Sequence, residues 1–444
     1  MNQSCKVSAF LAKHGVTAAG GSIDVLTRAM LADMESGLEK DPSGLPLEKA
    51  GMEPSLEMIP TWTKLPDSVP QNEPVIVIDA GGTNFRSCLV KFDSKGNPEI
   101  TNLEKCGMPG IKKELSKEEF FDAIAENLDH LKNMSSRIGF CFSYAMKITK
   151  DGDGQVISFS KEIKAKEVIG SLVGKSLSDA LVKRGWNRPE KIILLNDTAA
   201  ALLAGASTAV DGRDYSSYIG FILGTGMNAA YMERTIPKVS VENDSPQIVV
   251  CESGKFNKLP RCSFDVEIDS KTNTPGLYVF EKMCSGAYLG PVSSLALKTA
   301  AKEGLFSEKT AQEILALEDF GLIDMDKFLH GPKDSGTLLG RIANSGTDSD
   351  MDTMYRILDA FVDRSARLAA ANLSAAVIKS GEGHSPSRPV CILCEGTTFL
   401  KTHNLQKRVE AYLHTYLTME KGLYWNIVSM DNAITLGAAV AGLT

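Results

Sequence analysis

The sequence predicts an α/β protein built from two related halves, and three segments carry that prediction. Residues 75–92 and 219–233 share one order, an apolar run, a glycine-rich turn and a returning apolar run, and lie about 145 positions apart. Between them, residues 192–205 form an apolar strand followed by an Ala/Leu-rich helix. A repeated strand–turn–strand unit with helical segments around it indicates two α/β halves that face one cleft.

The turn of the first hairpin has the groups that a phosphate needs. Gly81 and Gly82 let the backbone turn tightly and leave amide N–H groups accessible. The neighbouring side chains supply donors, a positive charge and an acid that can hold Mg²⁺ or its water: Thr83, Asn84, Arg86 and Asp79. Taken alone, this pattern is as common in plain hairpins as in phosphate-binding turns. The second turn, Gly224-Thr225-Gly226, favours a nucleotide site between two halves.

Asp197 is the main candidate for chemistry. It follows Asn196 at the carboxyl end of an apolar strand, where open α/β sheets bind ligands. The same position suits a helix N-cap, and the two roles are compatible.

The remaining elements follow from periodicity and turn signals. Residues 1–66 predict one helix, 23–40, and a Pro-containing lead-in. Three strands follow between 74 and 104, then a helix that opens with a capping box at Ser116, and a strand at 138–142.

The second half begins near residue 206. Its predicted elements, in order, are the hairpin 218–233, a strand 248–252, helices between 276 and 330, a long helix from about 352 to 379, a strand 390–394, a helix 400–417, a strand 425–430 and a final helix.

Length and composition narrow the function classes. A chain of 444 residues with 43% hydrophobic and 23% charged residues is typical of about two soluble domains. The net charge of −7 argues against a non-specific nucleic-acid binder, and no apolar run approaches the ~18 residues of a membrane span. Lys13 and His14 interrupt the apolar patch of the N-terminus, so no signal peptide is expected.

The nine cysteines, an odd number, indicate the reduced thiols of a cytoplasmic protein. Cys391 and Cys394 have the spacing of a redox or zinc motif, but residues three apart on a strand point to opposite faces. Structural cysteines are therefore expected there.

The motifs together resemble the hexokinase family, of the kind found in bacteria or protists, within the actin-like ATPase (ribonuclease H-like) superfamily of sugar kinases, actin and Hsp70. The resemblance covers nearly the whole chain, and its motifs occur in the family's order: 34–38, 58–62, 79–86, 142–144, 196–198, 223–231 and 281–290. It implies a two-domain actin-like fold with a cleft. The expected division is 67–205 as small domain, with 431–444 returning to it, 206–430 as large domain, and 1–66 packed on the large domain.

The resemblance also implies site residues. It makes Asp197 the general base, with Lys161 offsetting charge on the transferred group, and assigns the sugar pocket to Ser143, Ser160, Lys161, Asn196, Asp197, Asn228, Glu252 and Glu281. ATP phosphates are expected at Gly81, Gly82, Thr83 and Asn84 and at Gly224, Thr225 and Gly226, adenosine at Gly396 and Thr397, Mg²⁺ at Asp79, and a tuning role for Arg86. From the residues alone, Lys161 and Glu252 are more typical of surface charges.

Departures from the family pattern affect the expected sugar and nucleotide preference, whereas the residues expected to carry the catalysis are kept. Ala145 replaces a common proline, Phe159-Ser160-Lys161-Glu162-Ile163 replaces Trp-Thr-Lys-Gly-Phe, the usual tryptophan after Glu252 is missing, and 430–439 lacks the Asp-Gly-Ser-Gly of many relatives. These changes leave sugar and nucleotide preference open.

The implied function is an ATP- and Mg²⁺-dependent hexokinase of cytoplasmic glycolysis, acting on the 6-hydroxyl of glucose as a monomer or homodimer. The alternatives are a kinase that prefers fructose, mannose or an N-acetylhexosamine, and a sugar-sensing regulator with weak catalysis. An actin- or chaperone-like ATPase would not need the sugar residues. A side chain at Gly82 or Gly226 is expected to block ATP while sugar binding survives.

Overall fold

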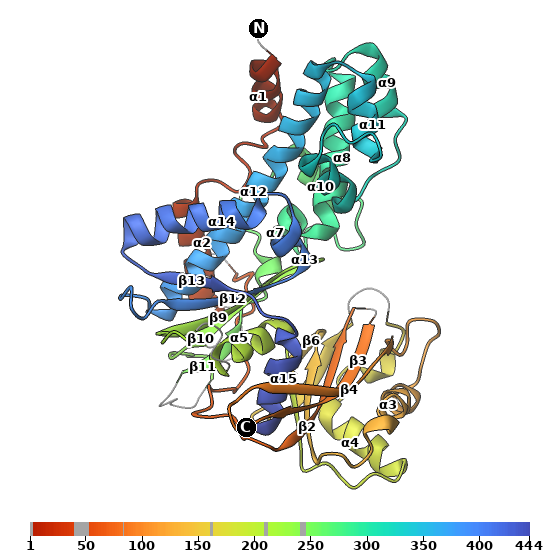
Figure 1. Ribbon diagram of the computed structural model, residues 1–444, viewed down its shortest axis with the longest axis vertical. Helices are drawn as coiled ribbons and strands as arrows, with labels where there is room; N and C mark the ends of the chain where they lie inside the picture. Colours follow the sequence, from red (N-terminus) through yellow and green to blue (C-terminus); the bar gives the residue numbers. More distant parts are fainter. Residues whose placement is uncertain (1–2, 40–52, 83, 160–162, 208–211, 240–245) are drawn as a thin grey trace.

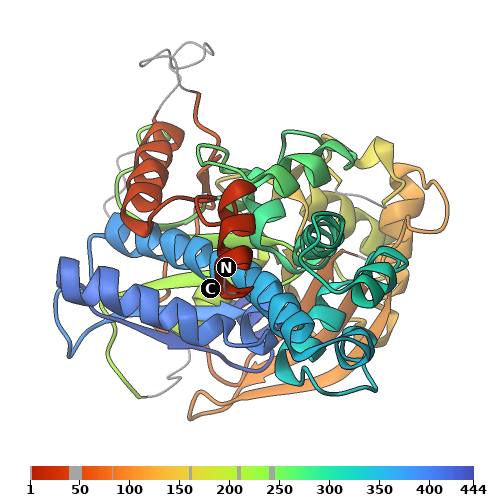
Figure 2. The same cartoon turned by 90° about the horizontal axis from the view of Figure 1, so that it is seen from above.

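The computed structural model describes residues 3–39, 53–82, 84–159, 163–207, 212–239 and 246–444. Its two main sheets lie at different heights of an elongated molecule (Figure 1). Seen from above, helices of the larger part lie over its sheet (Figure 2). The predicted two-domain α/β fold is confirmed.

The smaller part is built on five strands. In spatial order they are β4 (Pro98–Gly107), β3 (Asn84–Phe92), β2 (Pro74–Gly81), β5 (Arg137–Phe142) and β8 (Lys191–Leu195). β4, β3 and β2 are antiparallel, whereas β2, β5 and β8 are parallel. Beside this sheet lie α3 (Lys117–Glu126), α4 (Val173–Lys183), two 3₁₀ turns (Asp129–Leu131 and Lys166–Val168) and the hairpin of β6 (Ala145–Ile148) and β7 (Gly154–Ser158).

The larger part repeats this topology. Its six strands, in spatial order, are β1 (Ile59–Pro60), β11 (Gln247–Val250), β10 (Met227–Glu233), β9 (Ser217–Leu223), β12 (Val390–Glu395) and β13 (Trp425–Val428). As in the smaller sheet, an antiparallel hairpin leads into parallel strands. The glycine-rich turns of β2–β3 and β9–β10 thus occupy equivalent places in two related sheets.

Helices supply most of the larger part. They are α1 (Gln3–Lys13), α2 (Ile23–Leu38), α6 (Ser263–Ser270), α7 (Val279–Cys284), α8 (Gly286–Lys302), α9 (Glu308–Leu315), α10 (Leu322–His330), α11 (Leu338–Ser345), α12 (Asp348–Ser380), α13 (Thr397–Lys401) and α14 (Leu405–Leu413). None of the described helices is both long and apolar enough to span a bilayer.

Two helices, α5 (Asp197–Ser207) and α15 (Ala433–Leu443), lie side by side between the sheets (Figure 1). α5 follows β8 of the smaller sheet but packs on β9 and β12, and α15 follows β13 of the larger sheet but packs on β2 and β5. The two sheets therefore exchange helices. The helix that follows the last strand of one sheet packs on the other sheet. The crossing is tight, because a Cβ on Gly437 would lie 1.8 Å from the Ala200 carbonyl oxygen.

Buried residues form one core on each face of β2. Val75 and Val77 belong to the core around α5 and α15, whereas Ile76 and Ile78 belong to the core under α3 and α4. This alternation explains why the strand is apolar at consecutive positions. Cys391 and Cys394 likewise lie in two different cores, as their spacing predicts.

Some predicted boundaries were wrong. α1 was not expected. The helix predicted for 400–417 is broken, because Asn404 adopts φ +54° between α13 and α14, and a π-helix, His414–Glu420, follows α14. The strand predicted for 248–252 ends at Val250. Asparagine tolerates left-handed backbone well, which explains the break at Asn404.

Candidate active site

The β2–β3 turn places its predicted residues at the end of the smaller sheet. Asp79 pairs with Arg86 across the hairpin, and the Arg86 Nη1 lies 3.4 Å from the Asp79 Oδ2. Gly82 has φ +58°, and a Cβ there would meet no atom within 4 Å. The Tyr144 hydroxyl donates to the Gly82 carbonyl oxygen at 2.7 Å. The turn therefore has an accessible, left-handed glycine whose carbonyl is fixed from behind.

Neighbouring strands bring polar residues to the same edge. Ser143 follows β5 and lies so near Gly81 that a Cβ on the glycine would be 3.3 Å from the Ser143 Oγ. Asn196 and Asp197 follow β8, the next parallel strand. The Asn196 Oδ1 accepts from the Thr198 N–H (2.9 Å) and hydroxyl (2.6 Å), and the Asp197 Oδ1 accepts from the same N–H (2.8 Å). Both side chains thus cap the start of α5.

The second glycine-rich turn is held by helices of the larger part. The Gly224 carbonyl oxygen accepts from the Gly286 N–H and from the Thr398 hydroxyl, both at 2.8 Å. A Cβ on Gly396 (φ +104°) would lie 2.3 Å from the Leu223 carbonyl oxygen, so only glycine fits where β12 ends beside the turn. The predicted adenosine-side loop, Gly396 and Thr397, therefore adjoins the predicted phosphate turn.

The predicted sugar residues of the larger part, Asn228, Glu252 and Glu281, lie on or bond to β10 and the residues that follow it. The Asn228 Nδ2 donates to the Glu252 Oε1 at 3.0 Å, and the Glu281 Oε2 accepts from the Met227 N–H at 3.2 Å. A Cβ on Gly226 would lie 2.5 Å from that same Glu281 oxygen. The predicted sugar-binding carboxylate Glu281 and the predicted phosphate turn are consequently in direct contact.

Carboxyl groups from both sheets act on one another. The pKa of Asp197 is raised to about 6, chiefly by burial and also by the charge of Asp79, while bonds from Thr198 and Ser143 oppose the rise. Burial likewise raises the pKa of Glu252 to about 7, with a contribution from Asp197 and with Lys255 opposing it. Burial also raises the pKa of Asp79, against the nearby guanidinium of Arg86. A half-buried carboxylate with a pKa near neutrality is suited to accept a proton.

Not every predicted residue joins this group. Thr83, Ser160 and Lys161 lie outside the described residues. Asn84 pairs through its backbone with Gly81 and Gly107, and no hydrogen bond of its side chain is found among the described residues. Arg86 forms an ion pair with Asp79 across the hairpin.

Sequence reasoning missed several contributors. Glu252 has φ +56° and starts a 3₁₀ turn, Ser253–Lys255, which carries Lys255 back toward it. Lys255 also pairs with Glu57. The Ser253 N–H donates to the Asn228 Oδ1 at 3.1 Å. These contacts were missed because residues 248–252 were predicted to be strand throughout. The alternative that Glu252 is an ordinary surface charge is also wrong, because its side chain is half-buried and hydrogen-bonded.

One carboxylate, that of Asp79, is compatible with a Mg²⁺ site whose other ligands are phosphate oxygens and waters. Among the described residues, His, Cys, Asp and Glu side chains form no group of three that could hold a metal ion. Mg²⁺ keeps several waters and takes one or two carboxylates plus substrate phosphates. A single carboxylate beside a phosphate turn matches that donor set.

The chain is similar to known proteins along most of its length. Two family models, each described as Hexokinase, match residues 218–444 and 11–207. Hexokinase-1 of Pongo abelii is 30% identical over 403 residues, 86% of this chain and 42% of that protein. Hexokinase-1 of Schizosaccharomyces pombe is 30% identical over 376 residues, 80% of this chain and 74% of that protein. This chain thus spans less than half of the first relative.

A solved structure has the same fold. The hexokinase from Schistosoma mansoni complexed with glucose superimposes with a TM-score of 0.76 and 20% identity, covering 100% of both chains.

Proposed function

Because the chain belongs to the hexokinase family, we propose that it transfers the γ-phosphoryl group of ATP to the 6-hydroxyl of glucose or a related hexose. One observation carries this proposal: the pKa of Asp197 is raised to about 6, in part by the charge of Asp79 beside one glycine-rich turn, and Asp197 in turn raises the pKa of Glu252, beside the other turn. A sugar hydroxyl is a poor nucleophile, so a base at this meeting point accepts its proton as the bond to phosphorus forms.

The sugar is held by groups that donate and accept. Ser143 and Asn196 serve from the smaller sheet, and Asn228, Glu252 and Glu281 from the larger one. Each unmet buried hydroxyl or carboxylate costs about 1–3 kcal/mol, so a polyol that satisfies these groups is preferred over ligands that do not. Ser160 and Lys161 complete the proposed set.

The nucleotide lies along the two glycine-rich turns. Backbone N–H groups at Gly81-Gly82, with Thr83 and Asn84, and at Gly224-Thr225-Gly226 bind its phosphates. Gly396 and Thr397 lie on the adenosine side. Asp79 holds Mg²⁺, which neutralises phosphate charge when bound, and Arg86 limits the charge that Asp79 presents.

The pH profile of kcat/KM is expected to fall on the acid side. Because burial raises the pKa of Asp197 from 3.8 to about 6, the base form is lost as the pH falls through that value. Activity should then drop about tenfold per pH unit. Glu252, with a pKa of about 7, adds a second, higher inflection that a Glu252→Gln variant should lack. Initial rates at subsaturating hexose measure the profile. A profile that stays flat down to about pH 5 would contradict the assignment of Asp197.

A coupled assay of glucose, fructose, mannose and N-acetylglucosamine with ATP tests the function. Turnover of glucose supports the proposal. Turnover of fructose, mannose or the hexosamine alone would keep the kinase and overturn the substrate. Glucose binding without turnover by ATP, ADP, GTP or polyphosphate would favour the sensor.

The proposal extends to the cell. Nine free thiols suit a reducing cytoplasm, and hexose phosphorylation there feeds glycolysis. We keep the division into a small domain (67–205 with 431–444) and a large one (206–430, carrying 1–66) as part of it, together with a monomer or homodimer.

A further inference from the structure

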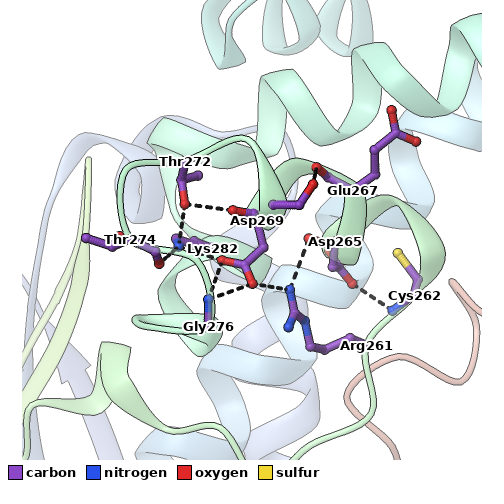
Figure 3. A network of polar contacts seen from close by, with 10 residues as sticks. Arg261, Cys262, Asp265, Glu267, Asp269, Thr272, Thr274, Gly276 and Lys282 are labelled. Atoms are coloured by element: carbon purple, nitrogen blue, oxygen red, sulfur yellow. Dashed lines mark hydrogen bonds and ion pairs between the residues drawn. The ribbon is translucent and has the colours of Figure 1, made fainter.

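Lys282 is a buried lysine beside the sugar site. It follows Glu281 in α7, and its side chain is only 4% exposed. Its Nζ donates to the Asp269 Oδ1 (2.6 Å), the Thr272 hydroxyl oxygen (2.8 Å) and the Thr274 carbonyl oxygen (2.6 Å), as Figure 3 shows. All three ammonium protons therefore have acceptors, and all three lie on one segment.

Asp269 is the centre of the same network. It is 7% exposed and accepts from Lys282, from the Gly276 N–H (3.2 and 3.0 Å) and from Arg261 (2.7 Å) (Figure 3). Burial raises its pKa, but these bonds outweigh burial and the pKa is lowered. Lys282 and Asp269 together fix the loop 271–278 between the end of α6 and the start of α7. We call these two residues the clamp.

The clamped loop ends in a strained residue. Tyr278 has φ +54°, a conformation that costs a non-glycine residue on the order of 1 kcal/mol and persists only where its surroundings impose it. α7 begins at the next residue, Val279. The clamp thus sets where α7 starts and which way its side chains point.

The positions of Glu281 and Glu252, the proposed sugar-binding carboxylates of the larger part, depend on where α7 begins. The Glu281 carboxylate accepts from the Met227 N–H of the β9–β10 hairpin. The Phe280 N–H donates to the Phe256 carbonyl oxygen at 3.1 Å, which ties α7 to the turn after Glu252. The Lys255 Nζ lies 5.5 Å from the centre of the Tyr278 ring. These contacts join α7 to the turn after Glu252.

We propose that Lys282 and Asp269 are positioning residues for hexose binding: by fixing the loop 271–278 they hold Glu281, and through α7 also Glu252, at the geometry that the sugar requires. This inference rests on the proposed function. A buried ion pair is weak evidence for stability, since apolar replacement of both partners is often neutral, so a role in placing neighbouring groups has to be tested separately from folding.

The test is a double-mutant cycle on the full chain. Lys282→Met keeps most of the side-chain volume and removes the three donors. It should raise the KM for glucose about tenfold or more, with a smaller change in kcat, because bound glucose meets misplaced carboxylates. In the double variant Lys282→Met/Glu281→Gln, the increase in the KM for glucose should be at least about fivefold smaller than the product of the two single increases. The reason is that both changes act through the same carboxylate.

A matched control removes a different ion pair of the larger part. Among the described residues, the Arg408 guanidinium donates to Asp359, which joins α14 to α12. Arg408→Met should leave the KM for glucose nearly unchanged, and its effect should multiply with that of Glu281→Gln. Thr272→Val removes one acceptor of Lys282 and should raise the KM for glucose less than Lys282→Met does. If Lys282→Met does not fold, Thr272→Val serves as the test of the positioning role.

The outcomes separate the two proposals. Wild type that neither binds nor phosphorylates any hexose overturns the proposed function. An active wild type in which Lys282→Met and Glu281→Gln multiply, or in which Lys282→Met lowers only the melting temperature, overturns the positioning role alone.

Discussion

Asp197→Ala is expected to lower kcat by about 10²–10⁴-fold while glucose still binds. The carboxylate lies at the start of α5, at the carboxyl end of β8, and its raised pKa of about 6 matches a base that works near neutral pH. The other proposed sugar residues remain in the variant. Calorimetry for glucose and a coupled assay for turnover measure the two quantities separately. Near wild-type turnover would overturn the mechanism.

The same side chain should reduce stability. Its folded pKa lies above the ordinary 3.8, so the folded protein binds the proton more tightly and is stabilised as the pH falls from about 6 toward 4. At neutral pH the part-buried charge opposes folding by on the order of 1–2 kcal/mol, allowing for its partial exposure. Asp197→Asn should therefore raise the melting temperature at neutral pH while lowering kcat as Asp197→Ala does, and the gain in melting temperature should shrink near pH 4.

Asp153 provides the matched control. Its carboxylate also lies in the smaller part, but it accepts from the Gly174 and Lys175 N–H groups at the start of α4 (2.6 and 2.9 Å). Asp153→Asn should lower the melting temperature and leave kcat per folded molecule unchanged. A rise in stability for both variants, or a fall for both, would contradict the assigned electrostatics.

Gly82→Val is expected to abolish ATP-dependent phosphorylation while hexose binding survives. The position has φ +58° and open space around it, so a side chain meets no protein atom but strains the backbone and occupies the approach to the phosphates. Gly96→Val is the control, because Gly96 has φ +81° and equally open surroundings in the β3–β4 turn. It should cost similar stability and leave turnover intact. Calorimetry with glucose and the coupled assay give both readouts, and full turnover by Gly82→Val would exclude close phosphate approach there.

Gly226 is not equivalent to Gly82, contrary to the expectation from sequence. A Cβ there would lie 2.5 Å from the Glu281 Oε2, so a side chain would displace the carboxylate that we propose binds the sugar. Sugar binding and turnover should therefore fall together in Gly226→Val. The glycine is needed for the contact between the turn and Glu281, not for left-handed backbone.

Local patterns predicted what depends on neighbours in sequence. The two glycine-rich hairpins and the capping box of α3, where Ser116 and Glu119 cap each other, are confirmed because apolar runs and turn residues encode them directly. The left-handed backbone of Glu252 and Tyr278 could not be read from the sequence, since both residues ordinarily avoid it and only distant contacts impose it.

The site shows the same limit. The family motifs named Glu252 and Glu281, but not the bond from the Met227 N–H or the clamp of Lys282 and Asp269, which join residues through a loop without any periodic pattern. Lys282 reads as an ordinary helix-surface lysine until its three acceptors are seen.

The exchanged helices α5 and α15 determine how the molecule unfolds. Removing α15 would leave the face of β2 and β5 that carries Val75 and Val77 open to water, and removing α5 would do the same to β9 and β12. Neither sheet has a complete core without a segment that the other one delivers. Two domains by architecture are thus one cooperative unit by thermodynamics: they should melt in a single calorimetric transition, and neither should be obtainable as an autonomous fragment.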